Sequence, residues 1–154
     1  MATADKNIEL IEMLSRNEEN IAALYKKYAD RFTDYKGFWN SLSAEELKHA
    51  DKLRSLIKTS GSELFVKGRF NVAAIQNFSK HIMSEADLVK VNKSTLINGL
   101  SIAMSLEQSL IEQKYFEVYE SDSAEIKQVL LNLAEDTRRH LDTVRQLWLK
   151  SNRK

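Results

Sequence analysis

Carboxylates and histidines interrupt the apolar faces of four helical segments, each near the middle of its segment. In the first segment Glu18 shares a helix face with Leu14 and Ile21, because residues three or four positions apart lie on one side of a helix. The same spacing predicts that six polar side chains point inward: Glu18, Glu46, His49, Glu107, Asp136 and His140. Buried carboxylates are unfavourable unless they are paired or bound to a cation. Since carboxylates and imidazoles bind iron and manganese, these residues predict a metal site.

The spacing of these residues matches a known ligand arrangement. Helical bundles that bind two iron or two manganese ions use one Glu from each of two helices and a Glu-x-x-His motif from each of the other two. Here Glu18 and Glu107 supply the single carboxylates, and Glu46 with His49 forms a complete Glu-x-x-His. Carboxylates would bridge the two ions, and histidines would supply neutral nitrogen ligands.

The fourth segment departs from this arrangement. The residue three positions before His140 is Thr137, whose hydroxyl is too weak a ligand to replace a carboxylate and is expected to bond to a helix carbonyl. Asp136 lies near the same face, although its side chain is one methylene shorter than that of Glu. Glu135 points further round the helix and is a weaker replacement. The sequence therefore predicts two bound ions, or one if no carboxylate fills this position.

A metal-free interpretation stays open. The inward carboxylates could form an internal salt-bridge network, in which Lys114, one heptad after Glu107, neutralises that carboxylate in place of a metal. His140 could likewise be a hydrogen-bonded core residue. Tyr25 and Tyr115 are expected to pack in the core, where either hydroxyl could bond to a ligand carboxylate. Three other side chains are expected at the surface, although the two carboxylates among them could also contact a ligand: Glu45, Glu112 and His81.

The composition bounds the class of protein. The 154 residues suffice for a single domain over residues 1–154, and the net charge of +1 argues against nucleic acid or an acidic membrane as partner. The absence of cysteine excludes disulfides, iron–sulfur clusters and thiolate zinc sites. Neither a secretory signal nor an apolar run long enough to span a membrane is present, so a cytoplasmic location is expected.

The pattern of apolar residues predicts an all-α fold, and a sequence with no proline and four glycines permits long helices. Four are predicted, at about residues 5–32, 35–58, 94–119 and from 123 onward, with Asp34 as the cap of the second. Short connections predict that the first two helices form an antiparallel hairpin, and the last two another. Residues 59–93 are expected to cross over along the bundle, so that the third helix runs parallel to the second. This crossover holds a short amphipathic helix marked by Val72, Ile75, Phe78 and Ile82.

Four stretches carry a family resemblance, in order along nearly the whole chain: NEENIAALYKKYAD, LSAEELKHADKL, AMSLEQSLIEQKYF and LAEDTRRHLDTV. With these stretches the chain resembles the rubrerythrin-like members of the ferritin-like superfamily. Glu18 followed seven residues later by Tyr25, the complete Glu-x-x-His, and Glu107 match the family pattern, whereas residues 136–140 stand where the family usually has a second Glu-x-x-His. Peroxide-reducing members also carry a four-cysteine rubredoxin domain, which this cysteine-free sequence does not contain.

The resemblance implies a ferritin-like four-helix bundle with a di-iron site, or a degenerate single-metal site, for oxygen, peroxide or iron chemistry. The protein would then be an oxidase- or peroxidase-type oxidoreductase served by an electron-donor protein, with manganese as an alternative metal. A metal-free descendant acting as a structural or binding protein is the main alternative, and a ferritin-type storage cage is a third. The resemblance also implies a homodimer through outward helix faces, where Phe38 and Phe70 are aromatic residues that the inward stripes do not use.

Overall fold

The computed structural model describes residues 2–60, 65–66, 72–91, 93–112, 119–120 and 124–152. Its helices are α1 (Ala2–Arg31), the 3-10 helix η1 (Thr33–Tyr35), α2 (Lys36–Ser60), α3 (Val72–Lys90), α4 (Leu96–Glu112) and α5 (Ala124–Asn152), and its two short strands are β1 (Phe65–Val66) and β2 (Tyr119–Glu120). The predicted all-α class is therefore confirmed. In the described part of the chain, no helix has both the length and the apolarity that a membrane crossing requires.

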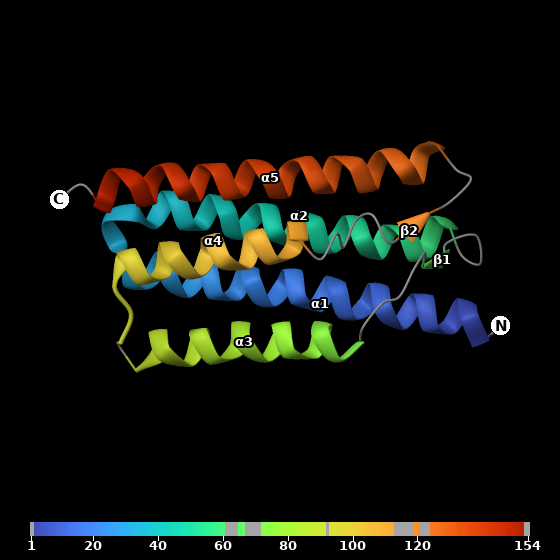
Figure 1. Cartoon of the computed structure of the whole chain (residues 1–154), viewed down its shortest axis with the longest axis horizontal. Coiled ribbons are helices and arrows are strands. Elements are labelled where there is room, and N and C mark those ends of the chain that lie inside the picture. The colour runs from blue at the N-terminus through green and yellow to red at the C-terminus, as the bar shows by residue number, and fades with distance from the viewer. Residues whose placement is uncertain are drawn as a thin grey trace.

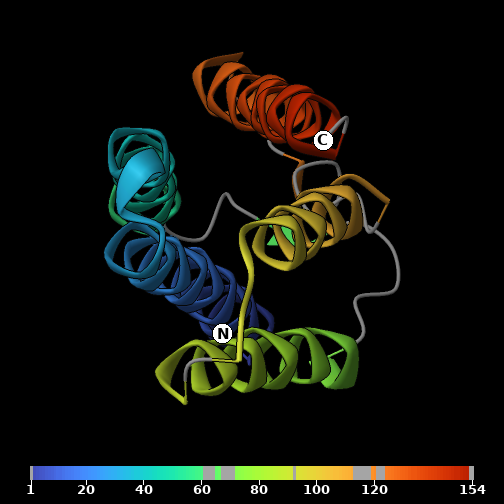
Figure 2. The ribbon, with the colours of Figure 1, turned by 90° about the vertical axis from the view of Figure 1, so that its left-hand side faces the viewer.

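The long helices form two antiparallel hairpins, α1 with α2 and α4 with α5 (Figure 1). Helices α2 and α4 run in the same direction (Figure 1). Helix α3, which connects them in the sequence, runs in the opposite direction along the bundle, as the predicted crossover requires (Figure 1). Seen along the bundle, α1, α2, α5 and α4 surround the centre, and α3 lies outside against α1 (Figure 2). This is the predicted ferritin-like arrangement.

A tight turn joins α1 to α2. The backbone N–H of Phe32 donates to the carbonyl of Tyr28 at 2.8 Å, and the N–H of Tyr35 donates to the carbonyl of Phe32 at 2.9 Å. Asp34, the predicted helix cap, lies inside η1, and α2 begins after it at Lys36. The predicted short hairpin connection is confirmed, although its local form is a 3-10 turn.

Aromatic side chains of α1 and α2 pack together next to this turn. The ring of Trp39 lies 4.8 Å from that of Tyr28 and 5.5 Å from that of Tyr25, measured between centroids, and all three residues are fully buried. Aromatic side chains bury large apolar areas, so this cluster contributes strongly to the α1–α2 contact. Gly99 of α4 approaches it closely, because a Cβ atom there would lie only 3.0 Å from the ring of Phe32. A glycine at this position therefore lets α4 pack against α1.

The crossover helix is longer than predicted. α3 has 19 residues, and its buried residues include the predicted Ile75, Phe78 and Ile82. Val72 was predicted on the same face but is 43% exposed, whereas Val89 at the other end of α3 is buried. The apolar stripe thus extends further along the chain than the pattern indicated, and it anchors α3 to α1.

The predicted end of the third helix, at residue 119, is wrong. The structure describes α4 over Leu96–Glu112 and α5 over Ala124–Asn152. Tyr119 and Glu120 instead form β2, which pairs antiparallel with β1 in the crossover, with Phe65 opposite Glu120 and Val66 opposite Tyr119. The main-chain hydrogen bonds of these residues therefore go to a distant segment rather than to a further helical turn.

Candidate metal centre

Three carboxylates from three different helices lie together in the middle of the bundle. Glu18 of α1, Glu46 of α2 and Glu107 of α4 each expose at most 2% of their surface. Their burial agrees with the inward faces predicted from the sequence. Such a cluster is stable only if protons, cationic partners or metal ions compensate its negative charge.

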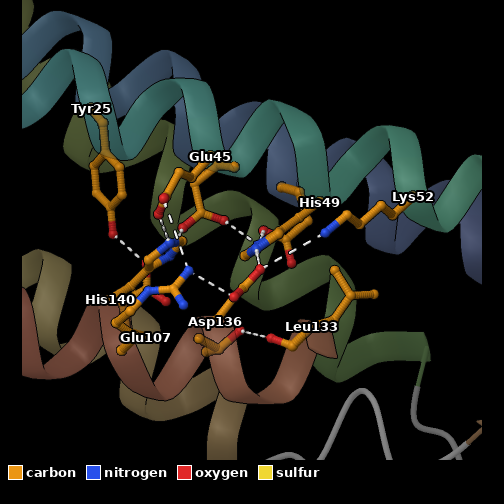
Figure 3. A network of polar contacts seen from close by, with 12 residues as sticks. Tyr25, Glu45, His49, Lys52, Glu107, Leu133, Asp136 and His140 are labelled. Atoms are coloured by element: carbon orange, nitrogen blue, oxygen red, sulfur yellow. Dashed lines mark hydrogen bonds and ion pairs between the residues drawn. The ribbon is translucent and has the colours of Figure 1, made fainter. Parts of the chain in front are cut away.

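Two histidines face these carboxylates from neighbouring helices. His49 of α2 and His140 of α5 are 2% and 1% exposed, and their rings stack with centroids 5.1 Å apart and planes 18° from parallel. His49 lies one turn after Glu46, whereas His140 reaches the same place from α5 (Figure 3). The structure therefore brings both predicted histidines to the carboxylate cluster.

Glu46 lies between the two imidazoles. Its Oε1 is 2.8 Å from Nδ1 of His140, and its Oε2 is 3.2 Å from Nδ1 of His49. Oε1 of Glu107 lies 3.8 Å from Nδ1 of His140, and we call Glu46, Glu107 and His140 the His140 half-site. Oε2 of Glu18 lies 3.9 Å from Nδ1 of His49, and we call Glu46, Glu18 and His49 the His49 half-site. The centre thus has two similar halves that share one carboxylate.

A second layer of charged side chains lies on the outer side of the imidazoles (Figure 3). Oδ2 of Asp136 is 3.2 Å from Nε2 of His49, and the carboxylate of Glu45 contacts Nε2 of His140. These two carboxylates are partly exposed, at 21% for the Asp136 side chain and 37% for that of Glu45. Arg139 lies near both, with Nη2 2.7 Å from Asp136 and 3.9 Å from Glu45. We call Glu45 and Asp136 the outer carboxylates.

Sequence reasoning left the role of Glu45 undecided between solvent and a contact with a ligand, and the structure shows the contact. The signal was its position directly before Glu46, which places Glu45 at the border of the inward face of α2. No pattern within α2 alone could have shown that its partner is His140, because that histidine comes from α5.

Thr137 holds the inward position where the full motif would have a carboxylate, and it is 1% exposed. Its Oγ1 donates a hydrogen bond of 2.9 Å to the main-chain oxygen of Leu133, as predicted. Glu135 is exposed. Of the carboxylates considered as replacements on α5, Asp136 is therefore the one that reaches the centre, and it does so through Nε2 of His49.

Tyr25 supports one of the inner carboxylates. Its hydroxyl donates a hydrogen bond of 2.9 Å to Oε1 of Glu107, so the predicted contact between a tyrosine and a candidate ligand is present (Figure 3). Burial, and then the charge of Glu107, raises the pKa of Tyr25 well above its usual value. The phenol therefore remains a hydrogen-bond donor at physiological pH.

Other sequence predictions meet mixed outcomes. His81 is exposed, as expected. Phe38 is partly buried and packs edge to face against Trp39 with ring centroids 5.2 Å apart, so its ring is partly used within the chain. The predictions for four residues fall outside the described side chains: Phe70, Glu112, Lys114 and Tyr115.

Burial and neighbouring charges move the pKa values of the cluster in opposite directions. Burial, and then the charge of Glu46, raises the pKa of Glu18 and of Glu107 well above the usual value. Burial alone would also raise the pKa of Glu46, but the close approach of Glu18 and of both histidines lowers it well below that value. Burial disfavours the cationic form of His140, yet Glu46 and Glu45 together raise its pKa. Without a bound ion, burial therefore favours the protonated forms of Glu18 and Glu107, whereas the neighbours of Glu46 favour its ionised form.

Unsatisfied atoms at the centre fit a cation. Four buried atoms make no hydrogen bond of good geometry among the described residues, although the third lies 3.2 Å from the second: Oε2 of Glu18, Oε2 of Glu46, Nδ1 of His49 and Oε2 of Glu107. Leaving such atoms unpaired is unfavourable, and a metal ion would satisfy them. One ligand atom from each of Glu46, His49 and His140 lies within 4.8 Å of the other two. Carboxylate and imidazole donors at this spacing fit iron or manganese.

Comparisons with known proteins agree with this fold. The family model described as rubrerythrin matches residues 9–148, a span that includes every predicted ligand. No curated protein and no solved structure matches the chain. Because the family match covers most of the 154 residues, the chain belongs to the rubrerythrin family of ferritin-like proteins.

Proposed function

We propose that this protein binds a pair of metal ions in the middle of its helical bundle and uses them in oxygen, peroxide or iron chemistry. Iron is the first candidate for the metal. The observation that carries the proposal is the position of Glu46, which presents one oxygen to each of two imidazoles. A carboxylate that offers its two oxygens in different directions is suited to bridge two ions, as carboxylates do in di-iron bundles.

The two half-sites support two ions rather than one. Glu46, His140 and Glu107 would hold the first ion, and the other oxygen of Glu46 with His49 and Glu18 would hold the second. Each half has its own imidazole and its own carboxylate besides the shared one, so neither depends on a carboxylate from position 137. Manganese prefers the same donors and is the second candidate.

The protein contributes burial and positioning to this chemistry. A bound iron pair would supply the electrons that reduce dioxygen or peroxide. Glu18, Glu46 and Glu107 lie away from bulk water, which strengthens electrostatic interactions within the centre. Tyr25 orients Glu107 through the hydrogen bond to its Oε1.

The alternative function is that of a metal-free structural or binding protein, and one observation favours it. The two imidazoles next to Glu46 favour its ionised form, and burial raises the pKa of Glu18 and of Glu107, which favours their protonated forms. The cluster can therefore be compensated without a metal. In that case it would act as a polar core that links α2 to α5.

Iron loading distinguishes the two functions. Protein loaded with ferrous iron without oxygen and then desalted is expected to retain about two ions per chain. His49→Ala should lower this content, because it removes the imidazole of one half-site, whereas His81→Ala is the matched control on the exposed face of α3. Circular dichroism of both variants checks that the helices are intact.

Two results of this experiment are required for a metal site at His49. The wild-type protein must retain iron after desalting, and it must retain more than His49→Ala does. A wild type without iron would favour the metal-free function. Equal losses in His49→Ala and His81→Ala would place the metal elsewhere in the chain.

A further inference from the structure

The proposed metal centre has fewer negative charges than two divalent ions have positive ones. Glu18, Glu46 and Glu107 carry one negative charge each when they are ionised, and the imidazoles of His49 and His140 are neutral as ligands. Four positive charges against three negative ones leave one positive charge unbalanced among buried residues. Unpaired charge inside a protein is unfavourable. In the full arrangement, the second Glu-x-x-His supplies a fourth carboxylate and removes the imbalance.

The side chains of α5 next to this position do not replace that carboxylate on the inner side. Thr137 occupies the position, is 1% exposed, and donates its hydroxyl hydrogen to the carbonyl of Leu133. Asp136 lies in the outer layer, where Nη2 of Arg139 is 2.7 Å from its Oδ1. Glu135 is exposed. Since a glutamate extends further from the helix than a threonine, by a methylene and a carboxyl group, α5 presents no anion to the centre at this point.

We propose that a small carboxylate from solution, with two oxygens on one carbon, binds beside Thr137 and completes the centre as its fourth carboxylate. The proposal rests on the proposed function, because bound metal ions hold this anion. Thr137 lies one turn before His140, so the anion joins the His140 half-site. One negative charge matches the one unbalanced positive charge, and two oxygens reproduce the donors of the glutamate in the full arrangement. Formate and hydrogencarbonate share this chemistry.

Solvent reaches the edge of the centre between α2 and α5. The outer carboxylates contact the two imidazoles, yet their side chains are partly exposed, at 37% for Glu45 and 21% for Asp136 (Figure 3). Lys52 and Arg139 lie beside Asp136, with Nζ of Lys52 at 4.0 Å and Nη2 of Arg139 at 2.7 Å. These cations offset the charge of the outer carboxylates, which would otherwise repel an incoming anion. A small anion can therefore approach the centre from this side.

Nuclear magnetic resonance of ¹³C-labelled formate tests for the anion directly. Zn²⁺ is a diamagnetic probe for the metal centre, so the signal of the carboxylate carbon stays observable. In carbonate-free buffer, the Zn²⁺-loaded wild type is expected to bind about one formate per chain, and the metal-free protein none. An equal amount of bound formate in the metal-free protein would overturn the proposal, because the anion would then be held elsewhere in the chain.

Variants at position 137 locate the anion. Thr137→Glu supplies its own carboxylate, and Thr137→Leu fills the same place with an apolar side chain, so neither should bind formate. Thr137→Val keeps the shape of threonine and should bind formate as the wild type does, because the hydroxyl is committed to Leu133. Zn²⁺ content and circular dichroism check that each variant is intact, and Thr137→Leu decides if Thr137→Glu does not fold. Formate binding that persists in Thr137→Leu would overturn the proposal.

The affinity for the metal gives a second readout. The anion and the metal must strengthen each other's binding by the same factor. With formate at about ten times its dissociation constant, the apparent Zn²⁺ affinity of the wild type and of Thr137→Val should rise about tenfold, and that of Thr137→Leu should not change. Sodium chloride at the same ionic strength is the control. An equal rise with chloride would show that any anion compensates the charge and would overturn a carboxylate site.

Competition identifies the source of the carboxylate. Displacement of bound ¹³C-formate by hydrogencarbonate would support a site that takes either anion, and formate that hydrogencarbonate does not displace would support a site limited to formate-like carboxylates. The same samples separate this proposal from the proposed function. A wild type that takes up Zn²⁺ without formate would overturn the anion site and leave the metal centre standing. A wild type that takes up no Zn²⁺, with or without formate, would overturn both.

Discussion

Tyr25 and Tyr28 lie one turn apart on α1 and are both fully buried, but only Tyr25 uses its hydroxyl in a hydrogen bond among the described residues. Tyr25 donates to Oε1 of Glu107 at 2.9 Å. Both rings pack against Trp39. The two tyrosines are therefore a matched pair that share their packing and differ in the hydrogen bond.

Replacing each of these tyrosines with phenylalanine isolates that hydrogen bond. Tyr25→Phe is expected to lower the free energy of unfolding by about 1–2 kcal/mol, because Oε1 of Glu107 loses its donor inside the core. Tyr28→Phe should leave stability unchanged or raise it, since it removes a buried hydroxyl without a partner in the described part of the chain. Urea denaturation measures both, and equal losses would contradict the assignment.

Thr137→Glu restores the missing carboxylate on α5. In the protein without metal it should lower the free energy of unfolding by about 3 kcal/mol, because it adds a buried charge beside other carboxylates. With iron present it should slow the loss of iron to a competing chelator, because it adds a carboxylate at the centre, and should raise the rate of ferrous oxidation. Thr137→Val, which keeps the shape and removes only the bond to Leu133, is the control and should change stability by no more than about 1 kcal/mol.

Thermal unfolding with and without iron, together with metal analysis, checks Thr137→Glu. If the variant unfolds at the wild-type temperature without metal and loses iron to the chelator as fast as the wild type does, position 137 does not face the centre.

The inner carboxylates predict a pH dependence of stability in the protein without metal. Burial, and then Glu46, raises the pKa of Glu18 and of Glu107 above the usual value of 4.5. Groups whose pKa is raised by folding stabilise fully below their unfolded pKa, and this stabilisation is lost as the pH rises through the folded pKa. The raised pKa of His140 acts in the same direction.

We therefore expect the melting temperature of chelator-treated protein to fall as the pH is raised from about 5 to about 8. Glu18→Gln removes one of the titrating groups and should flatten this fall. Scanning calorimetry measures it. A melting temperature that rises steadily over the same range would contradict the sign.

Metal binding should release protons, because Glu18 and Glu107 must ionise to become ligands. The apparent affinity for Mn²⁺ should then increase with pH. Titration calorimetry in two buffers of different ionisation enthalpy should give different apparent binding enthalpies, with a smaller difference for Glu18→Gln. Identical enthalpies in both buffers would mean that no proton is released.

The homodimer implied by the family resemblance stays a prediction. Large apolar side chains on outward helix faces are consistent with it, among them Met83 and Leu131, which are 57% and 58% exposed. Light scattering is expected to give the mass of two chains at micromolar concentration. The mass of a single chain under those conditions would contradict the dimer.

The helical fold and the inward polar residues were predictable from local patterns. Glu18, His49 and Glu107 share helix faces with apolar residues at spacings of three and four, and a helix buries whichever face is apolar. All of them are buried, because the periodicity that reveals a helix also determines which side chains point inward. Thr137 is a similar case, since its bond to Leu133 lies within one turn of α5.

The strand at Tyr119 and Glu120 was not predictable in this way. The apolar pattern favours a helix as far as residue 119, but Tyr119 and Glu120 pair with a strand in the crossover, more than fifty residues earlier in the chain. Helical propensity is a weak preference that tertiary contacts override. A pairing between segments so far apart leaves no signal in either of them alone.

The sequence by itself determined that this chain forms a ferritin-like bundle with carboxylates and histidines at its centre. Only the tertiary structure decided which atom of another helix each of these side chains contacts. Asp136 is four residues before His140 and could have faced the inner carboxylates, yet it meets Nε2 of His49, while Glu45 meets Nε2 of His140. The physical reason is that helical spacing fixes a side chain's direction about its own axis, whereas its partner depends on how α2 packs against α5.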